Sequence, residues 1–388
     1  MAILALFSMS VVLVLVAMYR HQIPLISPYG IFVAFQCLYN LLPWAFRGLP
    51  GLDQRAVDQQ LIIAAVSDIA FAIVIAVSYR KPEFQLFLSA TRGKRRRYTI
   101  LCLPLFVVTA VLCHYFGWHI FADPGAATGG MASVTEYFKH FSVACFLYYL
   151  IRYGVDRYTV LLLSGLTVIM VIDGARTDLF PVLVIALMFW HGSAVSQWKL
   201  IAVFAVGISL LLAMRGFLIH SSGINILFAP VVAEGLLGAS SSIQSIFAVQ
   251  HMLHPPYLFG IGSLDSWVAG INPWIIGDFA PYGGFYYVAD GVANFGYAGP
   301  ILETAVFAWV LCRSEKWKQS SPLIYLAFMS SIGLLFTKVH LVNGIKLFLA
   351  ELLFLSLIEL FRKSRNLIAL QAQEAFSRYL EGSLAPPT

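Results

Sequence analysis

Long apolar runs recur along almost the whole chain, and they constrain the fold more than any other feature of the sequence. From Ala2 to Phe361, runs of membrane-crossing length follow one another with only short polar segments between most of them. Apolar residues make up 60% of the 388 residues and charged residues only 11%, which excludes a water-soluble globular domain. We therefore expect an all-α polytopic membrane protein with a single membrane domain over residues 1–388.

The apolar runs predict about eleven transmembrane helices. The shorter runs are near the lower limit for a full crossing, so a tilted or partly re-entrant helix is an alternative for them. The predicted spans are Ala2–Met18, Ile23–Phe46, Leu61–Tyr79, Tyr98–Phe121, Tyr137–Ile151, Tyr158–Ile172, Leu179–Ser193, Leu200–Met214, Val292–Cys312, Leu323–Phe336 and Asn343–Phe361.

Clusters of basic residues predict the orientation of these spans. Arg80-Lys81 and the run Lys94 to Arg97 lie between the third and fourth spans, and cytoplasmic loops are rich in Lys and Arg. The net charge of +6 thus indicates topology and not a nucleic-acid partner. One alternating assignment places the N-terminus outside, the C-terminus in the cytoplasm and a tail with an interfacial helix at 362–388. This assignment places further basic residues on the cytoplasmic side, namely Arg20, Arg152, Arg157, Lys199, Arg313, Lys316, Lys318 and Arg362. It places Arg47, Arg55 and Lys139 on the outer side.

The segment 215–291 is predicted to be a large extracytoplasmic loop that contains short helices. It is too long for a turn, is broken by Gly and Pro, and after Arg215 carries acidic residues and no Lys or Arg. Aromatic rings beside carboxylates and amides are typical of sugar binding, although aromatic residues also gather at any membrane interface. The candidate glycan-binding residues in and just after this loop are Asp265, Asp278, Trp274, Tyr282, Tyr286 and Asn294.

Two arginines lie at the outer ends of predicted spans, against the positive-inside trend. An arginine at membrane depth costs on the order of 3 kcal/mol unless it is paired or hydrated, so Arg176 and Arg215 need a physical reason. A lipid pyrophosphate is one, because the guanidinium group grips phosphate oxygens bidentately. Pairing of Arg176 with a neighbouring aspartate, Asp173 or Asp178, is the alternative. Lys338 could add positive potential to the same cavity or could anchor its helix at the interface.

Three carboxylates, Asp68, Glu303 and Glu351, fall inside predicted spans and must face the interior of the helix bundle. They could serve a transporter as proton-relay groups, or be paired or protonated without a functional role. In the large loop, His220 or His254 could accept a proton from a sugar hydroxyl. The spacing of the histidines and cysteines indicates no metal site.

Three local features resemble the O-antigen polymerase (Wzy-like) and O-antigen ligase superfamily of bacterial surface-polysaccharide assembly. Gly174-Ala175-Arg176-Thr177 follows an apolar span, Arg215 precedes the large loop, and Asp290-Gly-Val-Ala-Asn-Phe-Gly-Tyr-Ala-Gly299 opens the ninth span. The similarity in layout covers most of the chain. An acid followed by Asn-Phe-Gly-x-x-Gly is similar to repeat-unit polymerases.

The resemblance implies a metal-independent glycosyltransferase of the bacterial inner membrane, with no cofactor. It would move a glycan from undecaprenyl pyrophosphate to a lipid-linked acceptor repeat at the periplasmic face. Arg176 and Arg215 would stabilise the leaving pyrophosphate, and Asp290 is the first candidate for the general base, before His220 and His254. A chain-length regulator is a possible partner implied by the family.

Two other functions stay open on the sequence. A polysaccharide flippase or transporter would also need cationic groups in a membrane cavity, but such proteins ordinarily have short loops and internal repeats. An O-antigen ligase would share the reaction and differ in its acceptor.

Overall fold

The computed structural model describes residues 1–48, 53–80, 95–116, 130–173, 176–191, 225–251, 286–336 and 344–364, together with isolated residues between 199 and 209. Helix accounts for 91% of it and, within these ranges, no residue lies in a strand. The prediction of an all-α fold is therefore confirmed for the described part of the chain.

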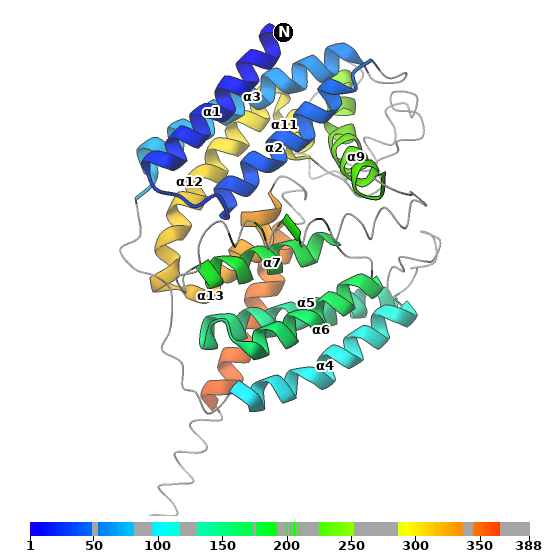
Figure 1. Cartoon of the computed structure of the whole chain (residues 1–388), viewed down its shortest axis with the longest axis vertical. Helices are drawn as coiled ribbons and strands as arrows, with labels where there is room; N and C mark the ends of the chain where they lie inside the picture. The colour runs from blue at the N-terminus through cyan, green and yellow to red at the C-terminus, as the bar shows by residue number, and fades with distance from the viewer. Residues whose placement is uncertain are drawn as a thin grey trace, which may run out of the picture.

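Three helices from the N-terminal part of the described chain and three from residues 225–320 form the first group of the structure (Figure 1). The long helix α3 packs against α1 and α12, and α9 packs against α2, α3 and α11. The members are α1 (Ala2–Arg20), α2 (Pro28–Ala45), α3 (Gln54–Ser78), α9 (Asn225–Gln250), α11 (Tyr287–Phe295) and α12 (Gly299–Ser320).

The second group consists of α4 (Arg95–Phe116), α5 (Gly130–Tyr153) and α6 (Arg157–Asp173), which pack against one another. Between the two groups lie α7 (Arg176–His191), α13 (Pro322–Phe328) and the π-helix η4 (Met329–Gly333), as Figure 1 shows. Helix α7 contacts α5, α6 and η4, while α13 contacts α12 and α5. These short elements connect the two groups.

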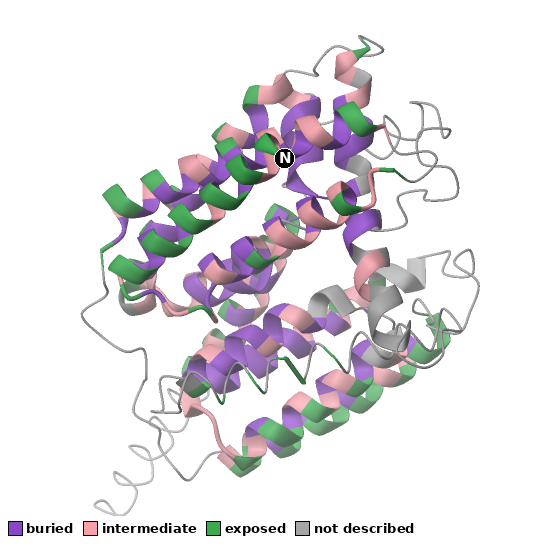
Figure 2. Cartoon of the chain, turned by 45° about the horizontal axis from the view of Figure 1, so that its top comes forward, coloured by how far each residue is buried: buried purple, intermediate pink, exposed green. Residues whose placement is uncertain are grey.

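Four helical segments in the described residues are long and apolar enough to cross a membrane: Ala2–Arg20, Gln54–Ser78, Arg95–Phe116 and Tyr287–Lys318. Arg157–Met170, Leu179–Trp190 and Pro322–Gly333 are apolar but shorter. Many residues of α1 and α4 are exposed (Figure 2), and they include the large apolar residues Val12, Leu13, Val107 and Val108, as expected for lipid contact. The membrane character is supported, whereas the count of about eleven spans is not confirmed.

Helix α9 is longer than the short helices expected within 215–291, whereas the assignment of that segment as an extracytoplasmic loop stays a prediction. The helix is 26 residues long, and its residues Ala239, Ile243 and Ile246 are buried. The glycines that made this segment resemble a loop instead allow close packing, because a Cβ on Gly238 would lie 2.3 Å from Cε1 of Tyr39 on α2.

The predicted ninth span, Val292–Cys312, is also interrupted. Helix α11 ends at Phe295 and is followed by Gly296, which has a φ of +65°, and α12 begins at Gly299. A positive φ at this position favours glycine, which has no Cβ to clash with the following carbonyl. The two helices therefore meet at a tight break and not as one straight rod.

The helix at 344–364 runs parallel to α5. Along α5, successive residues contact successively later residues of the 344–364 helix. The two helices therefore point in the same direction. The contacts are His140 with Glu351 at 3.4 Å between Nδ1 and Oε1, Phe141 with Phe354 at 5.4 Å between ring centroids, and Tyr148 with Glu359 at 2.6 Å between Oη and Oε2.

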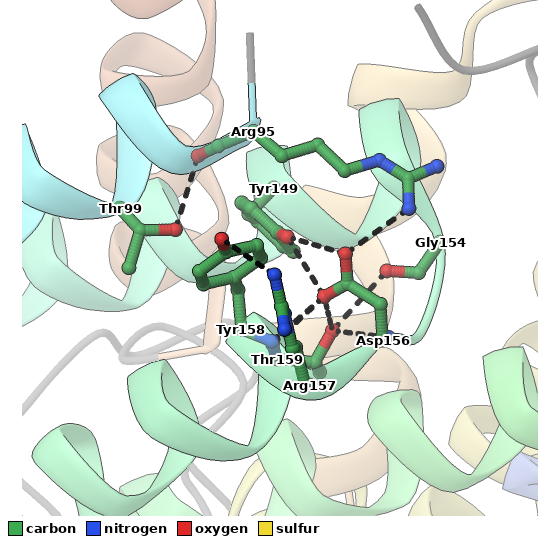
Figure 3. Close-up of polar contacts among 8 residues, drawn as sticks. All are labelled: Arg95, Thr99, Tyr149, Gly154, Asp156, Arg157, Tyr158 and Thr159. Atoms are coloured by element: carbon green, nitrogen blue, oxygen red, sulfur yellow. Dashed lines mark hydrogen bonds and ion pairs between the residues drawn. The ribbon is translucent and has the colours of Figure 1, made fainter. Parts of the chain in front are cut away.

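Several basic residues that are predicted to lie on the cytoplasmic side are found at one end of the second group of helices. Arg95 at the start of α4 is 3.1 Å from Asp156, beside Arg157 at the start of α6 (Figure 3). At the same end of α5, the charges of Arg152 and Arg362 act on the Tyr148 hydroxyl. These residues share one end of the second group, and the orientation of that end across the membrane stays a prediction.

Candidate functional site

Four ionisable side chains meet on α5 and the 344–364 helix, and we call them the acid–histidine cluster: Glu136, Lys139, His140 and Glu351. The first three lie on one face of α5, because residues three and four positions apart are neighbours on a helix. Lys139 Nζ is 2.7 Å from Glu136 Oε2. His140 stands between the carboxylates, with Nδ1 at 3.4 Å from Glu351 Oε1 and Nε2 at 3.7 Å from Glu136 Oε2.

The cluster becomes more buried from Glu136 toward Glu351. The side chain of Glu136 is 42% exposed, that of His140 14% and that of Glu351 4%. Lys139 is also only 4% exposed, so its ammonium group is held beside Glu136 among apolar helices. Charges in such surroundings are costly unless they are paired, and each member of this cluster has an oppositely charged or ionisable neighbour within 4 Å.

A small cavity adjoins His140 and Glu351. It has about 10 Å³ of room for the centre of a water molecule, which is close to the space that one water requires. Val143 of α5, Pro181 and Val182 of α7, Ser330 of η4, Leu335 and Leu347 complete its lining. The cavity therefore brings four separate elements to the acid–histidine cluster.

The π-helix η4 contributes Ser330 to this lining. A π-turn inserts an extra residue into a helix and occurs frequently at functional sites. Here it lies between α13 and Leu335, where α7 packs against it. Its position beside a buried charged cluster is a second reason to place the candidate site here.

The predicted phosphate-binding residue Arg176 begins α7, at the same end of the helix as the cavity. Pro181 follows it by five residues, a rise of about 7.5 Å along the helix axis, so the cavity lies between one and two turns from the start of α7. The structure describes the backbone of Arg176 but not its side chain.

Three other predicted site residues lie on or beside α11, in the first group of helices. Asn294 donates a hydrogen bond from Nδ2 to the backbone oxygen of Asp290, at 2.9 Å, which holds the end of the helix. Asp290 is half-buried, and its carboxylate is within electrostatic range of Glu303. The structure thus brings Asp290 and Asn294 together but gives Asn294 a structural role in this conformation.

Tyr286 is fully buried, which differs from the glycan-binding surface expected for it. Its hydroxyl donates to Gln36 Oε1 and accepts a hydrogen bond from Asn40 Nδ2 at 2.8 Å. Ser242 and Gln60 extend this network, with Ser242 Oγ donating to Gln60 Oε1 at 2.6 Å. The ring is enclosed because α9 covers α2 and α11, a contact that the sequence did not predict.

The remaining predicted site residues lie outside the described residues, and their assignments stay predictions. They are His220, His254, Arg215, Lys338, Asp265, Asp278, Trp274 and Tyr282.

The carboxylates within predicted spans were expected to face the interior of the helix bundle. This is confirmed for Asp68 and Glu351, whose residues are 1% and 3% exposed. Glu303 is half-buried. Asp68 accepts a hydrogen bond from Ser10 Oγ at 3.2 Å and so joins α3 to α1. Sequence reasoning missed Glu136 and His140, although their spacing of four residues in an apolar run was a visible signal of a paired acid and histidine.

Within the described ranges, no group of three or more His, Cys, Asp or Glu side chains is arranged to hold a metal ion. The acid–histidine cluster instead has the geometry of a proton-transfer group. One imidazole nitrogen faces a buried carboxylate, and the other faces the more exposed end of the cluster.

Comparison of the chain with known protein families, with curated proteins and with solved structures found no match in any of the three. The functional argument therefore depends on the residues and geometry of this chain.

Proposed function

We propose that this protein is an oligosaccharide repeat-unit polymerase of the bacterial inner membrane. It would transfer a glycan from undecaprenyl pyrophosphate to a lipid-linked acceptor repeat at the periplasmic face. The observation that carries the proposal is the acid–histidine cluster, because Pro181 and Val182 of α7, the helix that begins at Arg176, line the cavity beside His140 and Glu351. The motif resemblance at Arg176 and at Asp290–Gly299 supports the same function.

The reaction needs two kinds of group. The leaving pyrophosphate needs positive charge, which Arg176 would provide, with Arg215 and Lys338 as further candidates. The acceptor hydroxyl needs a group that takes its proton. In the sequence-based assignment that group is Asp290, with His220 and His254 as alternatives.

A transporter of lipid-linked sugars is the second candidate. The specific observation in its favour is the pair of deeply buried carboxylates, Asp68 and Glu351, because proton-coupled transporters place such groups inside their helix bundles. A ligase that attaches finished polymer to lipid A core would share the chemistry of the polymerase.

Complementation of a deletion strain separates these functions. The surface polysaccharide would be analysed by gel electrophoresis after expression of wild type, Arg176→Ala or Arg176→Lys, with the membrane level of each variant measured. We expect wild type to restore a ladder of chain lengths and Arg176→Ala to leave single repeats on lipid A core. Arg176→Lys should recover only part of the ladder, because a lysine cannot grip phosphate bidentately.

Each outcome of the deletion has a distinct meaning. Single repeats attached to lipid A core support the polymerase. Complete absence of attached sugar indicates ligation or flipping instead, and an unchanged ladder in the deletion strain contradicts any role in polysaccharide assembly.

A further inference from the structure

We infer that one end of the second group of helices binds the headgroup of an anionic phospholipid, such as phosphatidylglycerol, while the acyl chains lie along α4 or α6. We call this end the basic end, because α4 and α6 begin there and α5 and the 344–364 helix end there, each with cationic side chains. Its cationic residues are Arg95, Arg96, Arg97, Arg152, Arg157, Arg362 and Lys363. The inference does not depend on the proposed glycosyl transfer.

Contacts between the helices hold these cations at the same end. Arg95 at the start of α4 is 3.1 Å from Asp156, which directly precedes α6. The hydroxyl of Tyr153, the last residue of α5, lies within electrostatic range of Arg95, Arg152 and Arg362. The positive charges of four helices are therefore close together in space.

The positive charge of the basic end is only partly neutralised. The segments that form it, 95–101, 148–161 and 359–364, contain two carboxylates, Asp156 and Glu359, against seven cations. Asp156 is paired with an arginine of α4, and Glu359 with an arginine of its own helix. The remaining excess of cations attracts an anionic surface. Four of the cationic residues are exposed: Arg96, Arg97, Arg157 and Lys363.

One guanidinium donor at the basic end lacks an acceptor. Arg95 Nη1 donates to Asp156 Oδ2 at 3.1 Å, but Arg95 Nε is buried and has no hydrogen-bond partner among the described residues. A buried donor without a partner is unfavourable. A phosphate oxygen is a suitable acceptor, because hydrogen bonds between a guanidinium group and a charged oxygen are strong.

Helices α4 and α6 run parallel from the basic end. An early contact joins Arg95 of α4 to Asp156, and a later one brings Phe106 of α4 beside Gly165 of α6, where an added Cβ would lie 2.8 Å from Cδ2 of the ring. Both contacts advance along the two helices in the same direction. A lipid whose headgroup lies at the basic end can therefore extend its chains along either helix.

Each of these helices presents an exposed arginine followed by exposed apolar side chains at the same spacing. In α4 the series is Arg97, Leu101 and Val108, and in α6 it is Arg157, Leu161 and Val168. Steps of four and seven residues keep a series on one face of a helix. The last valine lies about 16 Å along the axis from the arginine, close to the ~15 Å half-thickness of the hydrocarbon core. This order matches a headgroup followed by its acyl chains.

Tyrosine rings mark the depth of the basic end in the membrane. The ring centroid of Tyr98 lies 6.0 Å from those of Tyr148 and Tyr149 and 6.1 Å from that of Tyr153. Tyrosine is enriched at the level of the lipid headgroups. The arginines of the basic end thus lie at the depth where phosphate groups are found.

The test is native mass spectrometry of the full-length protein in detergent, titrated with phosphatidylglycerol or with phosphatidylcholine of the same acyl chains. Wild type should bind phosphatidylglycerol more tightly. The triple variant Arg96→Gln, Arg97→Gln and Arg157→Gln should bind it about 10- to 100-fold more weakly, because each cation near an anionic surface contributes roughly fivefold. Arg95 is left unchanged because it holds Asp156, and circular dichroism would check that the variant is folded.

A matched triple variant separates a site from a general attraction between charges. Arg20→Gln, Arg313→Gln and Lys316→Gln remove the same number of exposed cations from the first group of helices, which the basic clusters place on the same predicted side. This variant should keep wild-type affinity for phosphatidylglycerol. Inorganic phosphate, added at matched ionic strength, should displace little lipid, because it cannot contact the apolar faces of α4 and α6.

Four outcomes would contradict the inference. Wild type could bind phosphatidylcholine as tightly as phosphatidylglycerol, or the basic-end variant could keep wild-type affinity. The matched variant could lose as much affinity as the basic-end variant, which would indicate general attraction only. Full displacement of the lipid by inorganic phosphate would indicate a phosphate site that does not recognise lipid. Since the measurement requires no glycosyl transfer, none of these outcomes bears on the proposed function.

Discussion

At the residue scale, the glycines of the Asp290–Gly299 motif have a packing role that is independent of catalysis. A Cβ on Gly299 would lie 1.9 Å from the backbone oxygen of Gly291, far inside contact distance. Gly296 has a φ of +65°, where glycine is favoured. The feature that resembles a family motif is therefore also what allows α11 to fold back tightly on α12.

We predict that Gly299→Ala destabilises the protein by about 1–3 kcal/mol or more, because the added methyl group overlaps backbone that cannot move away easily. Thermal unfolding of the purified protein in detergent would measure the loss. Gly48→Ala is the control, since a Cβ at Gly48 would meet nothing within 4 Å. Equal stability of the two variants would contradict the tight α11–α12 contact.

At the scale of elements, the turn between α5 and α6 is organised by Asp156 (Figure 3). Its carboxylate accepts hydrogen bonds from the backbone N–H groups of Tyr158 and Thr159, at 3.0 and 3.1 Å, and so caps the start of α6. The Thr159 hydroxyl accepts a hydrogen bond from the Asp156 N–H at 2.9 Å, which completes a reciprocal cap. Arg95 and the Tyr149 hydroxyl bind the same carboxylate, so one side chain joins three helices.

Asp156→Ala should lower the free energy of unfolding by about 1–3 kcal/mol, because the helix cap and two side-chain partners are lost together. Differential scanning fluorimetry in detergent would detect it as a lower Tm. The comparison is Asp58→Ala, which removes an exposed ion pair with Arg47 at 3.7 Å and should cost at most about 1 kcal/mol. If Asp156→Ala is as stable as Asp58→Ala, the turn does not depend on this carboxylate.

At the scale of the whole molecule, two groups of helices are joined by short elements, and the candidate site lies at that junction. The 344–364 helix follows α1 to α7 by more than a hundred residues in sequence, yet it packs along α5. This long-range contact brings Glu351 to His140. The other three members of the acid–histidine cluster lie together on α5 by helix spacing alone.

The parallel packing of α5 and the 344–364 helix can be tested by crosslinking. After replacement of the five native cysteines, Phe141→Cys with Phe354→Cys should be joined by a short bifunctional thiol reagent, because the native rings are 5.4 Å apart. The mismatched pair Tyr148→Cys with Phe354→Cys should react less. Linked peptides would be identified by mass spectrometry, and preferential linkage of the mismatched pair would exclude the parallel arrangement.

The sequence determined the all-helical fold, the membrane character and the interior position of Asp68 and Glu351. Each follows from a local rule. An apolar run is unfavourable in water, and a charge within it is unfavourable in lipid, whatever the rest of the fold. The same rules led us to expect only short helices in the segment that contains α9, because glycine can mark a loop in isolation and a close helix contact in a packed bundle.

Tertiary structure alone decided which distant polar groups meet. Tyr286 was predicted to bind sugar and is buried by α9. Lys139 pairs with Glu136 on the same helix, which is a local contact. His140 lies more than two hundred residues from Glu351 in the chain, so no local pattern could join them. The sequence shows where a buried charge would be energetically unfavourable. The packing of distant helices brings together partners such as His140 and Glu351, which reduce that penalty.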